Sequence, residues 1–369
     1  SFFSHSLLAM TDSTSTTEAA VSGAQTATGG YPPPPGKGST NGSPLRAEVF
    51  NSPKERVVKY VLGACALLSV LTTLGIAAVL IVESIGFFQA VGLGEFLGST
   101  EWTPQFADKH FGIWPLVSGT VLITVISALV SMPLGLASAI YISAYAPSTL
   151  RAWLKPGLEL LAGVPTVVYG YFALTFVTPI LKSVLPAIAP AAFDVWAFVL
   201  GIIPFVSPPD QPWTGDLGVF NALSAGLVVG IMVIPMVASL SEDAIQAVPK
   251  SLWNGAYALG ATKLEVVTRV VVPSAFSGIV ASFILALSRA IGETMIVTLA
   301  AGATPKLTLD PTESIQTMTA FIVQMGKGDV AQYTIEYKAL FAVGFVLFLI
   351  TLGMNIIANR IVARYQERY

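Results

Sequence analysis

The sequence is poor in charged residues, and this shortage excludes an ordinary water-soluble fold. Only 11% of the 369 residues are Asp, Glu, Lys or Arg, whereas 54% are hydrophobic. A soluble domain carries about a quarter charged residues, and it could not cover this much apolar surface with polar groups. The net charge of −2 also leaves no basic surface that would bind nucleic acid. The composition therefore predicts a protein that lies largely in lipid.

Signals of catalysis and of bound cofactors are also missing. The single cysteine, Cys65, lies within an apolar run and cannot form a disulfide inside the chain. The pattern Gly-x-x-x-x-Gly-Lys-Ser/Thr, which cradles the phosphates in many ATP-binding proteins, does not occur. The apolar segments contain no Ser/His/Asp combination and no cluster of metal ligands. We therefore predict a non-catalytic protein with no metal site and no cofactor.

Six apolar segments are each long enough to cross a membrane as a helix. About 20 apolar residues in a helix span a hydrocarbon core of about 30 Å. The predicted spans are residues 60–82, 114–145, 158–181, 219–240, 276–301 and 339–361. A shorter apolar run at 195–206 is interrupted by Pro204, and we predict that it is interfacial or re-entrant. The expected fold class is an all-α membrane protein with six transmembrane helices.

The first 53 residues differ from the rest, because they are rich in Ser, Thr, Gly and Pro and contain no apolar segment that could form a core. We predict a disordered cytoplasmic tail at 1–53 and a transmembrane domain at 54–369. Thirteen Lys and Arg residues fall in segments on the side of the N-terminus, and five fall on the other side. Because retained cytoplasmic segments carry an excess of Lys and Arg, both termini are expected in the cytoplasm.

The connection between the fourth and fifth spans, at about residues 241–273, is the longest one on the cytoplasmic side. Helix-forming residues flank Gly260, and Pro273 is suited to the first turn of the next span. We therefore predict two short helices joined at Gly260. An apolar stripe at helical spacing runs along the second of these helices, formed by Leu264, Val267 and Val271. Such a stripe on a loop in water predicts a protein partner.

The fifth span contains two opposite charges, Arg289 and Glu293, beside the hydroxyl side chains of Ser288 and Thr294. Charges in the hydrocarbon zone are costly, so they face a bundle interior or a water-filled path. The i, i+4 spacing places Arg289 and Glu293 on one face of a continuous helix, where they can pair. A guanidinium also offers matched donors to a tetrahedral oxyanion. We predict that these four residues line a substrate pathway; the alternative is an ion pair that fixes helix packing.

The cytoplasmic loop resembles the signature loop of the binding-protein-dependent ABC importer permeases. That signature reads Glu-Ala-Ala, a glycine four residues after the second Ala, nine further residues, then Ile, any residue, Leu and Pro. Ala256 and Gly260 match the Ala and the Gly, whereas Asn254 replaces the acidic residue. In the family this loop docks into the ATPase subunit. The resemblance therefore implies an ATPase-coupling role for the positions that correspond to the signature, which are Asn254, Gly255, Ala256, Gly260, Val270 and Pro273.

The segment from Arg289 to Met295, Arg-Ala-Ile-Gly-Glu-Thr-Met, resembles the phosphate permeases of the PstC type. Residues 161–170, Leu-Ala-Gly-Val-Pro-Thr-Val-Val-Tyr-Gly, resemble the same proteins. The paired subunit of that transporter usually reads Ala-Pro after the Thr, so the resemblance favours the PstC side. The resemblance to these permeases covers about residues 54–369. In that family the Arg and the Glu of the motif are needed for phosphate passage, which implies this role for Arg289 and Glu293.

The resemblance implies a permease of the MetI-like type in the bacterial inner membrane that imports inorganic phosphate, while partner subunits hydrolyse ATP. It implies as partners a homologous PstA-like permease, a dimer of a PstB-like ATPase, a periplasmic PstS-like phosphate-binding protein and membrane lipid. Three alternatives remain open at this point. The cargo could be another oxyanion such as sulfate or molybdate, the chain could be an ion-coupled secondary transporter with a proton relay at Arg289 and Glu293, or it could also take part in phosphate signalling.

Overall fold

The computed structural model describes residues 53–202, 217–328, 331 and 334–365. The tail predicted at 1–53 lies outside this part, apart from Pro53. The chain divides into two units, Ser1–Leu67 and Leu68–Tyr369, and the described part of the first unit is the beginning of one long helix. The core and the candidate site described below lie in the second unit.

The regular elements of the described residues are helices, and one isolated antiparallel bridge joins Trp102 to Phe111. Three short π-helical turns interrupt or extend the α-helices. The elements are α1 (Pro53–Phe88), α2 (Leu93–Gly98), α3 (Trp114–Ile140), η1 (Tyr141–Tyr145), α4 (Ser148–Ala162), α5 (Thr166–Phe172), η2 (Ala173–Val177), α6 (Thr178–Ile202), α7 (Ala222–Gln246), α8 (Lys250–Ala258), α9 (Lys263–Val266), η3 (Val267–Val271), α10 (Val272–Ser274), α11 (Phe276–Ile291), α12 (Met295–Ala300), α13 (Met318–Lys327) and α14 (Ile335–Tyr365).

Five helical stretches of the described chain are long and apolar enough to cross a membrane. A sixth is formed if Lys263–Ser274 and Phe276–Ile291, which meet at 70°, are one bent span. The five stretches are Arg56–Phe88, Trp114–Tyr145, Thr166–Ala187, Ala222–Gln246 and Ile335–Arg364. The predicted all-α multi-pass fold is confirmed. The orientation of the termini stays a prediction.

Two predicted spans differ from the observed helices. The third was expected at 158–181, but Gly163–Pro165 separates α4 from α5, because a proline removes a backbone donor and disfavours helix at the residue before it. The fifth was expected to run unbroken through 276–301, but it is divided into α11 and α12. The run at 195–206 continues α6 as far as Ile202, and its remaining residues lie outside the described part.

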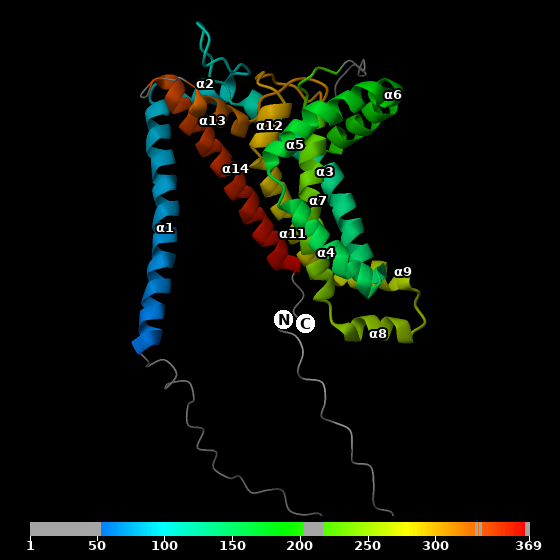
Figure 1. The fold of residues 1–369 in the computed structure, drawn as a ribbon. Helices are drawn as coiled ribbons and strands as arrows, with labels where there is room; N and C mark the ends of the chain where they lie inside the picture. The colour runs from blue at the N-terminus through cyan, green and yellow to red at the C-terminus, as the bar shows by residue number, and fades with distance from the viewer. Residues whose placement is uncertain (1–52, 203–216, 329–330, 332–333, 366–369) are drawn as a thin grey trace, which may run out of the picture. The chain divides into compact units, whose positions relative to one another are not determined.

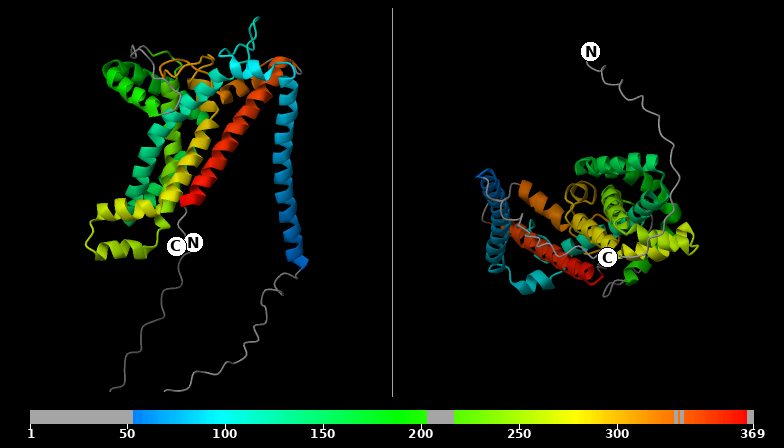
Figure 2. Two further views of the ribbon diagram at one scale, coloured as in Figure 1. Left: turned by 180° about the vertical axis from the view of Figure 1, so that it is seen from behind. Right: turned by 90° about the horizontal axis from the view of Figure 1, so that it is seen from below.

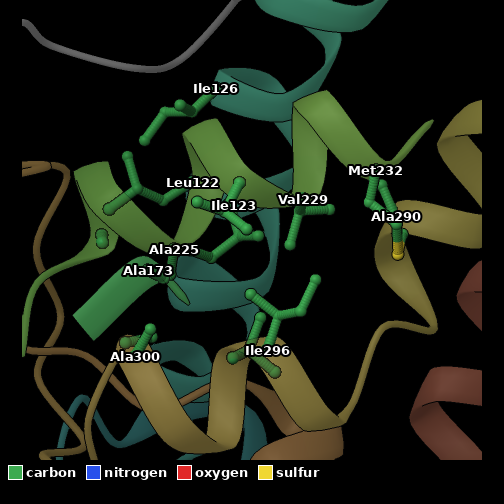
Figure 3. Packing of buried hydrophobic residues seen from close by; sticks show 14 of the residues in the cluster. Leu122, Ile123, Ile126, Ala173, Ala225, Val229, Met232, Ala290, Ile296 and Ala300 are labelled. Atoms are coloured by element: carbon green, nitrogen blue, oxygen red, sulfur yellow. The ribbon is translucent and has the colours of Figure 1, made fainter. Parts of the chain in front are cut away.

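The centre of the bundle is the contact of α3 with α7, and α11 lies beside both of them (Figures 1 and 2). Glycines allow the backbones to approach, since a Cβ added at Gly226 would lie 2.7 Å from the Cβ of Ile126. Small residues at helix interfaces are the usual means of close packing in lipid. Figure 3 shows Ile123, Ala225 and Val229 within the resulting buried cluster. The cluster also includes Ala290 of α11 and Ile296 of α12, so both sides of the break between these helices pack against this centre.

Candidate functional site: the break between α11 and α12

The candidate site is built where the fifth apolar segment changes from α11 to α12. Arg289 lies in the last turn of α11, and the helix ends at Gly292, the C-cap residue. Glu293 and Thr294 form the connection, and α12 begins at Met295. Arg289 lies thirteen residues beyond Phe276, which at 1.5 Å per residue is about 20 Å along α11. The charged residues are therefore far from the beginning of the span.

Glu293 is buried, with 7% of its surface exposed. Its Oε1 atom accepts hydrogen bonds from the backbone N–H groups of Met295 at 3.0 Å and of Ile296 at 3.3 Å. These are donors of the first turn of α12 that have no partner within that helix. The hydroxyl of Thr319 donates to the backbone carbonyl of Glu293 at 2.7 Å. Both the side chain and the backbone of Glu293 are thus held by neighbouring segments.

Arg289 has a different environment, because its side chain is exposed on this chain. Its Nη2 atom contacts a neutral atom, the Sδ of Met232 on α7, at 3.7 Å. Within the described residues Arg289 forms no ion pair. The predicted pairing with Glu293 is wrong, because the i, i+4 rule applies to a continuous helix and this helix ends between the two residues.

The two hydroxyl residues predicted beside these charges are engaged with protein groups. Ser288 donates from Oγ to Oδ1 of Asn355 on α14 at 3.4 Å, which links the end of α11 to the last helix. The hydroxyl of Thr294 donates to the carbonyl of Gly292 at 3.2 Å, across the break itself. The structure therefore brings all four predicted residues to one place, with Arg289 as the member that lacks a charged partner among the described residues.

The predicted coupling segment has the expected shape of two short helices joined at a glycine. α8 carries Asn254, Gly255 and Ala256, and Gly260 follows it with φ of +83°, a left-handed conformation that favours glycine. α9 then begins with a capping box, in which the Thr262 side chain accepts from the N–H of Glu265 and the Glu265 carboxylate accepts from the N–H of Thr262. α7 continues to Gln246, so the first six residues of the segment predicted at 241–273 are helical.

The apolar stripe of this segment is mostly internal, so the expectation of an exposed stripe is wrong for two of its three residues. Val267 and Val271 are buried in a cluster with Trp253 and Ile245. Leu264, at 63%, and Leu259, at 91%, are the most exposed large apolar side chains of the segment.

Of the two remaining coupling positions, Val270 lies in η3 and Pro273 in α10. Pro273 therefore precedes the 70° bend and does not open α11 as expected.

A second charged site was not found from the sequence. Glu242, near the end of α7, is 2% exposed and contacts two cations of α4, with Arg151 Nη2 at 2.5 Å and Lys155 Nζ at 2.9 Å. Lys155 also contacts Asp243 at 2.9 Å, and the Gln246 amide donates to Glu242. The hydrogen bond to Glu242, followed by that to Asp243, raises the pKa of Lys155 above its ordinary value. The consecutive acids at 242–243 were the available signal, but their partners lie about ninety residues away in sequence.

Comparison with known proteins now fixes the family. The family model described as "Binding-protein-dependent transport system inner membrane component" matches residues 131–369, which include the coupling segment and the break after α11. This chain belongs to that family. It is therefore a permease subunit of an ABC importer, a multi-pass and non-catalytic membrane component. An ion-coupled secondary transporter, considered from the sequence, is excluded by this membership.

Individual relatives of this permease cover most of its length. It is 31% identical over 295 residues to the "Probable ABC transporter permease protein YqgH" of Bacillus subtilis, covering 79% of this chain and 86% of that protein. It is 33% identical over 274 residues to the "Phosphate transport system permease protein PstC" of Xylella fastidiosa, covering 74% and 80%. A crystal structure of a bacterial ABC transporter involved in alginate import matches with a TM-score of 0.55 at 15% identity, over 85% of this chain and 99% of that one, and it supports the fold alone.

Proposed function

We propose that this permease carries inorganic phosphate and that Arg289 is an anion contact on its pathway. The observation that carries the proposal is the state of the guanidinium, which is exposed on this chain, deep along a span and unpaired within the described residues. A charge in such a place is costly unless water or a ligand reaches it. The guanidinium offers donors arranged for two oxygens of a tetrahedral anion.

The choice of phosphate rests on relatives. Several proteins named as phosphate transport permeases of the PstC type are 31–33% identical to this chain over most of its length. The first relative, YqgH, carries no substrate in its name, so sulfate and molybdate remain the competing cargoes. Arg289 must bind its anion weakly, because cargo that enters the pathway must also leave it. Affinity would then come from the soluble binding protein.

The partners follow from the same proposal. A homologous permease would complete the pathway, a dimer of ATPase subunits would supply energy, and a periplasmic phosphate-binding protein would deliver cargo to the bacterial inner membrane. On binding ATP, the ATPase dimer would move the coupling segment and shift the permease between its outward-open and inward-open states. The N-terminal and C-terminal ends would both lie in the cytoplasm.

Competition for uptake tests the cargo directly. The complete importer, reconstituted in vesicles with ATP inside the compartment that holds the ATPase subunits, would be given labelled phosphate with an excess of unlabelled arsenate, sulfate or molybdate. We expect arsenate, which has the charge and shape of phosphate, to reduce uptake strongly, and sulfate and molybdate to leave it nearly unchanged. Stronger competition by sulfate or molybdate than by arsenate would overturn the assignment.

We further propose that the ATPase docks on the turn between α8 and α9. The two exposed leucines support this, since Leu259 and Leu264 flank Gly260 and point apolar surface outward. Substitution of both by Asp should prevent co-purification of the ATPase. Phe106, exposed in the loop before α3, gives a matched control, because Phe106→Asp also adds a charge to exposed apolar surface. Retained association in the double leucine variant would rule out docking at this turn.

A further inference from the structure

We infer that Glu293 is a positioning residue, which caps α12, holds the span broken and keeps its own charge away from Arg289. The inference deepens the proposed function, because it rests on Arg289 being the anion contact. This role differs from the one predicted from the sequence, in which Glu293 lines the substrate pathway.

The geometry of the carboxylate is that of a helix cap. The N-cap residue of α12 is Thr294, and its side chain makes no capping hydrogen bond. The carboxylate of Glu293, one residue earlier, fills this role, because it accepts from the N–H groups of Met295 and Ile296, the first two residues of the helix. In lipid, unsatisfied backbone donors are more costly than in water, because no solvent can replace the missing acceptor. The carboxylate also places negative charge at the positive end of α12.

Residues of α5 and α13 also hold the first turn of α12 in place, in addition to the cap. Gly170 of α5 allows close contact, since a Cβ there would lie 3.2 Å from the Cα of Ile296. The Thr319 hydroxyl, from α13, holds the carbonyl of Glu293. Ile296 and Val297 are both buried in the central cluster. The first turn of α12 is therefore locked between α5, α13 and the connection that carries Glu293.

The break has an electrostatic consequence for Arg289. If α11 continued through Glu293 as one helix, the two side chains would share a face at i, i+4 and would pair. The carboxylate would then neutralise the guanidinium and compete with an arriving anion. Capping of α12 engages the carboxylate with backbone N–H groups, so that Arg289 keeps its donors for cargo.

Backbone hydrogen exchange of the complete importer in lipid nanodiscs tests the cap without reference to any cargo. The variants are Glu293→Gln, which keeps a carbonyl acceptor but removes the charge, and Glu293→Ala, which removes both. We expect exchange at Met295 and Ile296 to accelerate about 2- to 30-fold in Glu293→Ala, the ratio equivalent to the loss of an N-cap. Glu293→Gln should stay within about threefold of the wild type, because amide and carboxylate side chains cap helices about equally well. Glu159→Ala, which removes an exposed acid of α4, is the matched control.

Uptake of labelled phosphate by the same complexes separates positioning from contact with cargo. We expect Glu293→Gln to restore most of the uptake that Glu293→Ala loses. A hydrogen-exchange rate in Glu293→Ala equal to that of the wild type would overturn the inference. The inference would also fail if both variants lost uptake equally while the exchange rate of Glu293→Gln stayed normal. If the wild-type complex takes up no phosphate, the proposed function fails, but the exchange measurement still decides the role of Glu293. If Glu293→Ala does not assemble, Glu293→Gln alone decides, since loss of its uptake with normal exchange contradicts a capping role.

Discussion

Two buried carboxylates of this permease are stabilised in opposite ways. Glu293, at the break between α11 and α12, accepts from backbone N–H groups and leaves the nearby cation unpaired. Glu242, near the end of α7, forms ion pairs with both Arg151 and Lys155 of α4. The positive charge near Glu293 therefore remains available to a ligand, whereas the positive charges near Glu242 are already neutralised.

The difference follows from what each acid holds in place. Glu293 holds the short helix α12, whose residues pack against buried neighbours, and it does so through hydrogen bonds from backbone N–H groups alone. Glu242 holds α4, which has no buried residue of its own. Ion pairs of Arg151 and Lys155 with Glu242, and of Lys155 with Asp243, join α4 to α7. We therefore expect the two acids to respond differently when charge and hydrogen bonding are changed separately.

The largest expected effect is the loss of both cations around Glu242. The double variant Arg151→Ala and Lys155→Ala leaves a buried carboxylate without a charged partner, which should destabilise the protein by about 3–5 kcal/mol. Unfolding of the purified permease in a denaturing detergent titration would measure this. The exposed Arg269→Ala is the control and should change stability by less than about 0.5 kcal/mol. An equally small change in the double variant would mean that the α4 ion pairs are not structural.

The next effect compares the two acids by the same substitution. Glu242→Gln should cost about 2 kcal/mol, since an amide cannot neutralise two cations and charged hydrogen bonds are lost. Glu293→Gln should cost less than about 0.5 kcal/mol, because the amide still caps α12. Parallel unfolding measurements on the two variants give the contrast. Equal costs would remove the distinction drawn between the two sites.

A smaller effect is expected from Thr319→Val at the break. The substitution keeps the shape of the side chain but removes the hydroxyl that donates to the carbonyl of Glu293, at an expected cost of about 1 kcal/mol. Thr268→Val is the control, because it removes an exposed hydroxyl that also donates to a backbone carbonyl, that of Leu264 in its own segment. Thr312 is less suitable, because its hydroxyl donates to a carboxylate. A cost no greater than that of Thr268→Val would show that Thr319 does not help to hold the connection.

The smallest effect concerns pH at the α4 site. The hydrogen bond to Glu242 raises the pKa of Lys155 in the folded protein, so its contribution is complete below the unfolded value of about 10.4 and is lost as pH rises through the folded value. The effect is small because the Lys155 side chain is 36% exposed and solvent screens it. Stability measured from pH 9 upward should fall less in Lys155→Arg, since arginine stays charged. Identical alkaline profiles would contradict this assignment.

The sequence predicted the spans well where an apolar run is uninterrupted, and 114–145 agrees with the observed helix Trp114–Tyr145. It also located the turn at Gly260, because only a glycine between two helix-forming segments is needed there. It failed at the break, where the i, i+4 rule was applied across Gly292; a glycine followed by Glu293 and Thr294 was the signal for a helix end and a new cap. Glu242 could not be assigned, because pairing across about ninety residues depends on how α4 packs against α7.

The central claim is that the unpaired guanidinium of Arg289 contacts the anion in transit, and labelled phosphate uptake by the reconstituted importer tests it most directly. Arg289→Ala should lower uptake about tenfold or more, as expected when a charged hydrogen-bond donor is lost, while the complex still assembles. Arg289→Lys should retain part of the uptake, because it keeps the charge without the paired donors. Uptake by Arg289→Ala at the wild-type rate would contradict the account.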